Sequence, residues 1–305
     1  MIVECSLSLQ NGFENRGLIV PYLFKYNYYD CCIKVGIEVI PQKLFVNSNL
    51  TSFEIIPTMI MKHIPCLVGV DSIIDVDQFK SEIDIIKPHL DLDSLLFVSS
   101  DTCIKYKDTK HYLYDMDSSR ILNIFGFMPN IITFNEFIFK YSHPFIDCAG
   151  GYFNIDGTDY NKFKTPEVTH SSLALSRINP RQIGNIIGIV NLFEIFKSYN
   201  FNNVEILYNY LNENYTNQCQ ILTNDYLLSY TWLNLDKINQ AILRNGVNII
   251  CLFGINLIKH MEHFIIILDG KEQKYENIKE TINDLKNDII DYFKINSQIS
   301  EILFF

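Results

Sequence analysis

The sequence predicts an α+β protein in which an α/β part, residues 1–150, precedes a mainly helical part, residues 151–305. Short runs rich in β-branched and aromatic residues recur before residue 120 and predict strands. After residue 179, apolar residues return at helical spacing instead. The segment 147–160 (DCAGGYFNIDGTDY) is the richest in glycine, so we place the domain boundary near it.

In the first part, helix and strand signals alternate along the chain. Residues 5–17 are expected to form a helix, because Leu7, Leu9 and Phe13 can face a core and Gly17 is a stop signal. The further expected elements are a strand at 37–41, a short helix at 53–62, a strand at 66–71, and a hairpin with strands at 94–99 and 111–115.

The second part is predicted to be mainly helical. Asn179-Pro180 is expected to open one helix, in which Ile183, Ile186 and Val190 recur at helical spacing. Apolar residues at 278, 282, 285, 289 and 293 follow the same rhythm with charged residues between them, as in an amphipathic helix. The segments 204–215 and 235–243 have similar patterns and are expected to be helical too.

Composition excludes two classes of partner. The formal net charge is −10, whereas nucleic-acid affinity comes mainly from Lys and Arg that neutralise phosphates, so we expect no nucleic acid. The most apolar stretch, residues 247–258, has 12 residues, and a membrane span needs about 20. We therefore expect no membrane partner and interpret that stretch as a buried core element.

The cysteines indicate a reducing compartment. The chain has eight, scattered without a CxxC pair, in a sequence too long for a small disulfide scaffold. The amino terminus, MIVEC, lacks the charged and apolar regions of a secretion signal. A cytoplasmic location with free thiols is expected.

Cys5 is the first candidate for chemistry. A thiol at the start of a helix has its thiolate stabilised by unpaired backbone N–H groups and by the helix dipole, which lowers its pKa. Thiol nucleophiles of papain-like enzymes occupy such a position. The alternative is an inert, buried core cysteine.

Three short motifs resemble one family. They are residues 4–11 (ECSLSLQN), residues 64–71 (IPCLVGVD) and the strand that ends at 112–115 (YLYD). Together they resemble the amino-terminal domain of the butirosin-biosynthesis acyltransferases over roughly residues 1–120, and 188–197 (GIVNLFEIFK) resembles the helical region that follows in that family. The resemblance implies a papain-like fold that acts in specialised-metabolite biosynthesis. In such proteins a thiol takes an acyl group from a carrier-protein thioester and passes it to an amine or to water.

The general base is where the sequence departs from that family. The family position falls near Ser94 or Leu95, which carry no imidazole. His111 is the candidate base, with His89 as an alternative if the strand begins earlier. The orienting group would be Asp115, Asp117, Asn123 or Asn130, although Asp115 and Asp117 share a predicted strand with His111 and lie far from its ring.

The expected function is therefore cysteine-dependent acyl transfer, with Cys5 as nucleophile, His111 as base and Asp117 or Asp115 as orienting acid. The expected partners are an acyl or peptidyl carrier protein and a small amine. Two alternatives remain: a degenerate, non-catalytic binding protein of the same fold in a peptide-synthetase pathway, and a peptide hydrolase.

No cofactor and no metal are expected. His260 and His263 have ligand-like spacing, but no further ligands cluster near them in the sequence. Gly150, Gly151 and Gly157 match neither of the phosphate-binding patterns GxGxxG and GxxxxGK.

Overall fold

The computed structural model describes residues 3–9, 29–36, 42–46, 49–70, 72–107, 109–141, 143–148, 179–197, 228–259 and 261–304. The elements expected at 37–41 and 204–215, and all of the expected domain boundary beyond Cys148, lie outside these residues.

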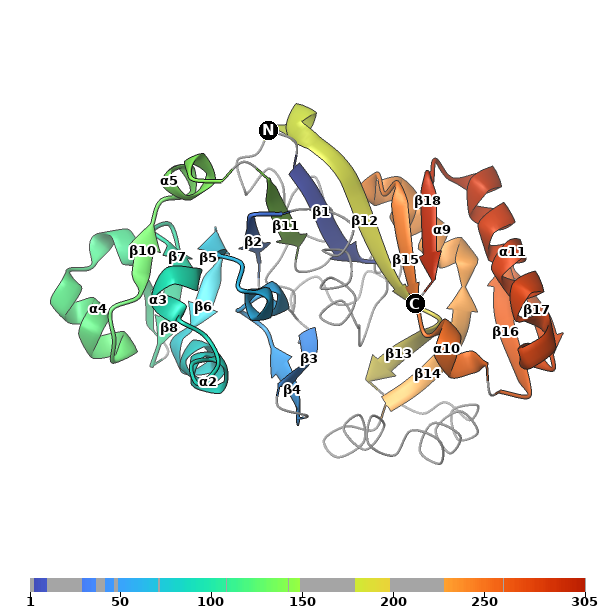
Figure 1. Cartoon of the computed structure of the whole chain (residues 1–305), viewed down its shortest axis with the longest axis horizontal. Coiled ribbons are helices and arrows are strands. Elements are labelled where there is room, and N and C mark those ends of the chain that lie inside the picture. Colours follow the sequence, from blue (N-terminus) through green and yellow to red (C-terminus); the bar gives the residue numbers. More distant parts are fainter. Residues whose placement is uncertain are drawn as a thin grey trace.

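A nine-stranded sheet, parallel throughout, runs through the middle of the molecule (Figure 1). In spatial order its strands are β10 (Asn130–Ile132), β7 (Leu96–Ser99), β5 (Cys66–Val70), β2 (Cys31–Val35), β11 (Pro144–Cys148), β1 (Val3–Ser8), β12 (Ile183–Asn191), β15 (Ile249–Phe253) and β18 (Glu301–Phe304). Strands from both sides of residue 150 share this one sheet. The expected α+β arrangement, a papain-like domain followed by a mainly helical domain, is therefore wrong.

Helices cover both faces of the sheet. Alternate residues of each strand belong to two separate apolar clusters; in β2, Cys31 and Ile33 belong to one cluster and Cys32 to the other. The first cluster includes side chains of α5 (Phe134–Phe139), α9 (Leu235–Asn245) and α11 (Ile278–Asn296). The second includes side chains of η1 (Thr58–Lys62), α2 (Val76–Ile86) and α4 (Ser118–Phe125).

Burial on both faces explains why the helix expected to open at Asn179-Pro180 is wrong. In β12, Ile186, Ile187, Ile189 and Val190 are all buried. A strand of a doubly covered parallel sheet is apolar at nearly every position, so its apolar residues also fall at helical spacing. Their β-branched side chains favour the strand that the structure shows.

The helix expected at residues 5–17 is wrong at its start for a related reason. Cys5, Leu7 and Leu9 belong to one apolar cluster because they share one face of β1 and its end, at a period of two. Residues 10–17 lie outside the described part of the chain.

Several other predicted elements are confirmed. The helices expected at 278–293 and 235–243 are α11 and α9, and the strand expected at 66–71 is β5. The short helix expected at 53–62 is confirmed only at η1. The expected hairpin is wrong, because β7 joins the central sheet and β9 (Thr109–Tyr112) pairs instead with β8 (Cys103–Tyr106).

Three smaller sheets flank the central one. The first contains β6 (Ile73–Asp75), β8 and β9. The second contains β13 (Phe193–Lys197), β14 (Leu228–Asn234), β16 (His263–Leu268) and β17 (Lys271–Glu276), and the third is the pair β3 (Gln42–Val46) and β4 (Asn49–Phe53). No helix in the described part of the chain is long and apolar enough to cross a membrane.

Side-chain caps define where the helices begin. Asp75 accepts hydrogen bonds from the first N–H groups of α2, Asp117 from that of Arg120 in α4, and Asn234 from that of Lys237 in α9. Gly126 and Gly246 follow α4 and α9 with positive φ, as is typical of helix ends.

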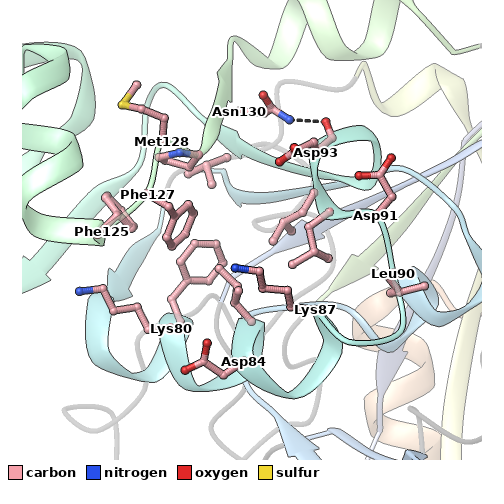
Figure 2. A pocket seen from close by; sticks show the side chains of 17 residues that line it. Lys80, Asp84, Lys87, Leu90, Asp91, Asp93, Phe125, Phe127, Met128 and Asn130 are labelled. Carbon is pink, nitrogen blue, oxygen red and sulfur yellow. Dashed lines mark hydrogen bonds between the residues drawn. The ribbon is translucent and has the colours of Figure 1, made fainter.

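A hollow of about 770 Å³ lies where α2 and the segment 125–130 approach the first residues of β7 and β10 (Figure 2). Its wall is apolar, and lysine and aspartate side chains surround it. Because β7 begins at Leu96 and β10 at Asn130, the hollow lies at the amino edge of the central sheet.

Asp236 ties α9 to the carboxyl-terminal elements. Its carboxylate accepts hydrogen bonds from the Tyr292 hydroxyl at 2.7 Å and from the N–H groups of Asp269 and Gly270 at 3.0 and 2.8 Å. Burial alone raises the pKa of Asp236, but these hydrogen bonds outweigh it and lower the pKa below its ordinary value.

We predict that Asp236→Asn lowers the free energy of unfolding by about 1.5–3 kcal/mol near pH 7, because hydrogen bonds to a charged acceptor are replaced. A lowered folded pKa means that this stabilisation is present above the unfolded pKa, about 4, and is lost as pH falls through the folded pKa. Denaturant unfolding from about pH 7 to 2 should show the wild-type and variant curves converging in acid. Asp291→Asn, at an exposed site on α11, is the control; a constant difference at all pH values contradicts the prediction.

Candidate functional site

The order of strands in the central sheet reverses at β1. From β1 the chain builds β2, β5, β7 and β10 on one side, returns to insert β11 beside β1, and then builds β12, β15 and β18 on the other side. In open parallel α/β sheets, ligands bind outside the carboxyl ends of the strands at such a switch point. The carboxyl ends of β2, β11, β1 and β12 are therefore the place to look for a site.

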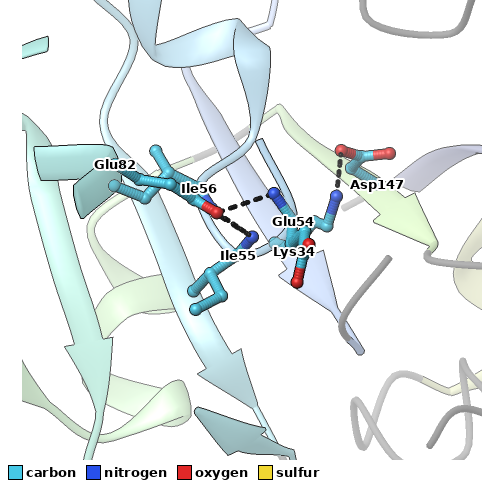
Figure 3. A network of polar contacts seen from close by, with 6 residues as sticks. All are labelled: Lys34, Glu54, Ile55, Ile56, Glu82 and Asp147. Carbon is cyan, nitrogen blue, oxygen red and sulfur yellow. Dashed lines mark hydrogen bonds and ion pairs between the residues drawn. The ribbon is translucent and has the colours of Figure 1, made fainter. Parts of the chain in front are cut away.

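A buried ion pair lies at this place (Figure 3). The ammonium of Lys34 in β2 is 3.4 Å from Oδ2 of Asp147 in β11, and the two side chains are 0% and 1% exposed. Each residue is the last but one of its strand, and the two are register partners. Removing two charges from water costs several kcal/mol per ion, so the pair requires a compensating role in folding or binding.

Ser6 continues this polar row onto β1. It is the register partner of Asp147 and is fully buried. Its hydroxyl has no hydrogen-bond partner among the described residues. Register partners in neighbouring parallel strands point to the same face, so Lys34, Asp147 and Ser6 form a polar row across three central strands. This row lies on the face that α2 and α4 cover.

Glu82 on α2 is a second buried carboxylate on that side (Figure 3). Its oxygens accept hydrogen bonds from the N–H groups of Glu54, Ile55 and Ile56 at 2.7, 3.2 and 2.7 Å, and from the side chain of Gln78 at 3.0 Å. Burial raises the pKa of Glu82 against the opposing effect of these bonds. Glu82 thus fixes the bend that follows β4.

The sequence contains a signal for the polar row that lies outside the three motifs. Lys34 interrupts the apolar run CCIKV, and Asp147 interrupts the run PFIDC. Single charges of opposite sign inside two strand-like runs indicate a buried pair, because an isolated buried charge is too costly.

Cys5 does not have the environment expected of a nucleophile. It lies inside β1 rather than at a helix start, and it is 0% exposed. Interaction with the Cys148 thiol and then burial raise its pKa well above the ordinary value, the reverse of activation.

His111 and the two aspartates lie apart from Cys5. His111 is on β9, in the sheet of β6, β8 and β9, and no hydrogen bond joins it to Cys5 in the described structure. The guanidinium of Arg120 donates to His111 Nδ1 at 3.0 Å, which leaves Nε2 to donate to the Thr109 hydroxyl at 2.9 Å. Asp117 caps α4, and Asp115 is exposed.

The other candidates are also dispersed. His89 lies in the turn after α2, and the amide of Asn130 donates to the carbonyl of Asp93. Among the described residues, no three His, Cys, Asp or Glu side chains cluster as metal ligands. Because His260 lies outside the described residues, its pairing with His263 stays a sequence observation.

Comparison with known proteins corrects the expected family. No protein-family model and no curated protein matches the chain. Among solved structures, fully ligated adenylosuccinate synthetase from Plasmodium falciparum is similar with a TM-score of 0.69 and 12% identity, over 99% of this chain and 96% of that chain. Cyanophage S-2L succinoaminodeoxyadenylate synthetase, bound to dGMP and to dATP as an energy donor, is similar with a TM-score of 0.65 and 11% identity, over 99% and 92%.

At these identities the likeness shows the fold alone. The chain has the fold of purine-nucleotide synthetases, so the resemblance to butirosin-biosynthesis acyltransferases and the papain-like fold are wrong. The expected acyl transfer in specialised metabolism loses its basis with them. The short motifs behind that resemblance, such as residues 64–71, are largely buried strand, which many α/β folds share.

We predict that Glu82→Gln destabilises the fold by about 2–4 kcal/mol, since an amide offers one acceptor oxygen to N–H groups that now share two. Chemical denaturation measures the change, and Glu272→Gln, at an exposed position of β17, is the matched control. A loss no larger than that of the control would show that the bend at residues 54–56 does not depend on this carboxylate.

We predict that Lys34→Met lowers the free energy of unfolding by about 3–5 kcal/mol, because it leaves the Asp147 carboxylate buried without the ammonium. Adding Asp147→Val to this variant should recover most of the lost stability. Denaturant unfolding of both variants tests this. Lys105→Met, which removes the exposed Lys105–Asp75 pair, should cost less than about 1 kcal/mol. A double variant as unstable as the single one contradicts the prediction.

Proposed function

We propose that this chain binds a purine nucleotide at the carboxyl edge of β2, β11 and β1. The observation that carries the proposal is the buried polar row of Lys34, Asp147 and Ser6, which lies at the switch point of a nucleotide-synthetase fold. The two solved structures compared above are named for purine-nucleotide products, and one holds a purine monophosphate together with a purine triphosphate.

Lys34 and Asp147 act as positioning residues in this proposal. Their ion pair locks the ends of β2 and β11 in register, one residue before each strand ends. The segments that leave those strands are the ones that contact a ligand at a switch point. A fixed pair of strand ends presents these segments without a reorganisation cost on binding.

The sequence directly after β1 supports phosphate binding. Residues 12–18 read Gly-Phe-Glu-Asn-Arg-Gly-Leu, which has the glycine spacing of the phosphate loop GxxxxGK[ST]. In that loop, glycines let backbone N–H groups approach phosphate and the lysine reaches the β- and γ-phosphates. Here Leu18 occupies the lysine position, so a monophosphate is the better match than a triphosphate.

A second candidate function is ligation itself, in which a triphosphate drives the joining of an amine to the purine nucleotide. The fold of the two synthetases and the basic Arg16, between the two glycines of the same sequence pattern, favour it. Leu18 counts against it, because the motif's lysine is what contacts the outer phosphates. Product formation separates the two candidates.

We predict micromolar binding of GMP, dGMP, IMP or AMP by isothermal titration calorimetry, and binding at least about tenfold weaker for CMP. The Lys34→Met/Asp147→Val variant should stay folded and bind the purine nucleotide at least about tenfold more weakly, since its strand ends lose their ionic lock. Lys105→Met serves as the control and should bind like the wild type. Equal binding of CMP, or no purine binding, refutes the proposal.

The ligation candidate is tested in the same preparation. Protein, monophosphate, aspartate and dATP or GTP are incubated, and mass spectrometry detects a nucleotide with an added succinyl-amino group. If the chain only binds the nucleotide, no adduct forms and no phosphate is released. In that case Leu18→Lys should bind the triphosphate more tightly than the wild type. An adduct formed by the wild type establishes the ligase reading instead.

A further inference from the structure

The hollow at the amino edge of β7 and β10 is a second site, separate from the polar row at the carboxyl edge. Its volume of about 770 Å³ lies within the range of small-molecule pockets, roughly 300–1,000 Å³. Helix α2 forms one wall and the segment 125–130, after α4, forms the other.

Three phenylalanines form part of the apolar wall of this hollow, beside aliphatic side chains. The Phe79 and Phe125 rings meet edge to face with centroids 6.1 Å apart, and the Phe125 and Phe127 rings do the same at 5.9 Å. Phe79 and Phe125 are buried, whereas Phe127 is only partly buried and lines the opening. The two buried rings therefore hold Phe127 in place, and Phe127 offers its ring to a further aromatic ring.

The two lysines of the hollow differ in what they contact. The Lys80 ammonium donates to the carbonyl of Ile124 at 2.6 Å, at the end of α4. The Lys87 ammonium makes no hydrogen bond or ion pair with any residue that the structure describes. In Figure 2 the Lys87 side chain points into the hollow, toward the rings, while Lys80 points outward.

Negative charge lies one helical turn from Lys87. Asp84 is three residues before it on α2, so the two side chains are neighbours on one helix face, with Cβ atoms about 5–6 Å apart. Asp84 likewise makes no hydrogen bond or ion pair through its carboxylate within the described residues. Asp91 accepts from the Ser94 hydroxyl at 3.0 Å, which leaves Lys87, Asp84 and Asp93 to face a ligand.

We propose that this hollow binds an aromatic amino acid. Its ring packs against Phe127, its carboxylate meets the Lys87 ammonium, and its ammonium meets the Asp84 carboxylate. A simple anion would face the two nearby aspartates and a simple cation would face Lys87. A molecule with adjacent charges of both signs satisfies the pair, and an aromatic ring packs on Phe127.

The test compares ligands that each lack one group. L-Tryptophan and L-phenylalanine are titrated by calorimetry and by ligand-observed NMR, beside tryptamine (no carboxylate), indole-3-propionate (no ammonium) and L-leucine (no ring). We expect the two aromatic amino acids to bind and each incomplete ligand to bind at least about tenfold more weakly. No saturable binding up to about 1 mM, or tryptamine equal to tryptophan, overturns the proposal.

Variants assign the contacts. Lys87→Met should weaken tryptophan at least about tenfold and leave tryptamine unchanged, and Asp84→Asn should weaken tryptophan and leave indole-3-propionate unchanged. Lys294→Met, at an exposed position near the end of α11, is the control. All of these side chains are exposed, and unchanged thermal midpoints verify folding.

The proposal stands apart from nucleotide binding. Because the hollow lies at the opposite edge of the sheet from Lys34 and Asp147, Lys87→Met should leave purine-nucleotide affinity at the wild-type value. If Lys87→Met lowers nucleotide affinity, the hollow belongs to the nucleotide site and the amino-acid proposal fails. If no nucleotide binds at all, the tryptophan titrations still decide the matter.

Discussion

The central sheet is covered by helices on both faces, and most of the structure follows from this constraint. Inner parallel strands must find apolar neighbours above and below, so most residues of β2, β5, β11 and β15 are apolar and buried. Against that background, each buried polar group is exceptional. The Lys34–Asp147 pair, Ser6 and Glu82 lie on the same side of the sheet and are all closed to solvent. Removing these groups from water costs free energy that other interactions must offset. Their position therefore marks the part of the fold where polar groups have a role besides packing.

The desolvation cost of the two buried carboxylates, Glu82 and Asp147, is offset by different partners. Glu82 is satisfied by three backbone N–H groups and one amide, so it needs no positive partner and works as an anchor for the bend after β4. Asp147 in β11 pairs with the Lys34 ammonium in the neighbouring strand β2. Removing either partner leaves the other charge buried among apolar side chains. The first arrangement fixes a loop to a helix. The second holds the ends of two strands in register, at the carboxyl edge of the sheet where ligands bind in this class of fold.

Amphipathic elements could be predicted from the sequence, whereas doubly buried ones could not. α11 has a polar face, so its period of about 3.6 residues is visible, and it was predicted with nearly correct bounds. β12 has no polar face over Ile186–Val190, so periodicity could not separate strand from helix. That wrong assignment, together with the missed strands β13 to β18, led to the expectation of a mainly helical second part. The prediction for Cys5 failed for the same reason. A thiol at a helix start has a lowered pKa, whereas the buried thiol of Cys5 in a central strand has a raised one.

The site was missed because its members are far apart in the sequence. Lys34 and Asp147 are separated by 113 residues, and only the insertion of β11 beside β2 makes them neighbours. A local motif cannot report such a pair, whereas the glycine spacing after β1 is local and readable. Leu18 stands where the phosphate-loop pattern has its lysine, and that lysine is the charge that holds the outer phosphates. Under the proposed function, the glycine spacing without the lysine therefore favours a monophosphate over a triphosphate as the ligand.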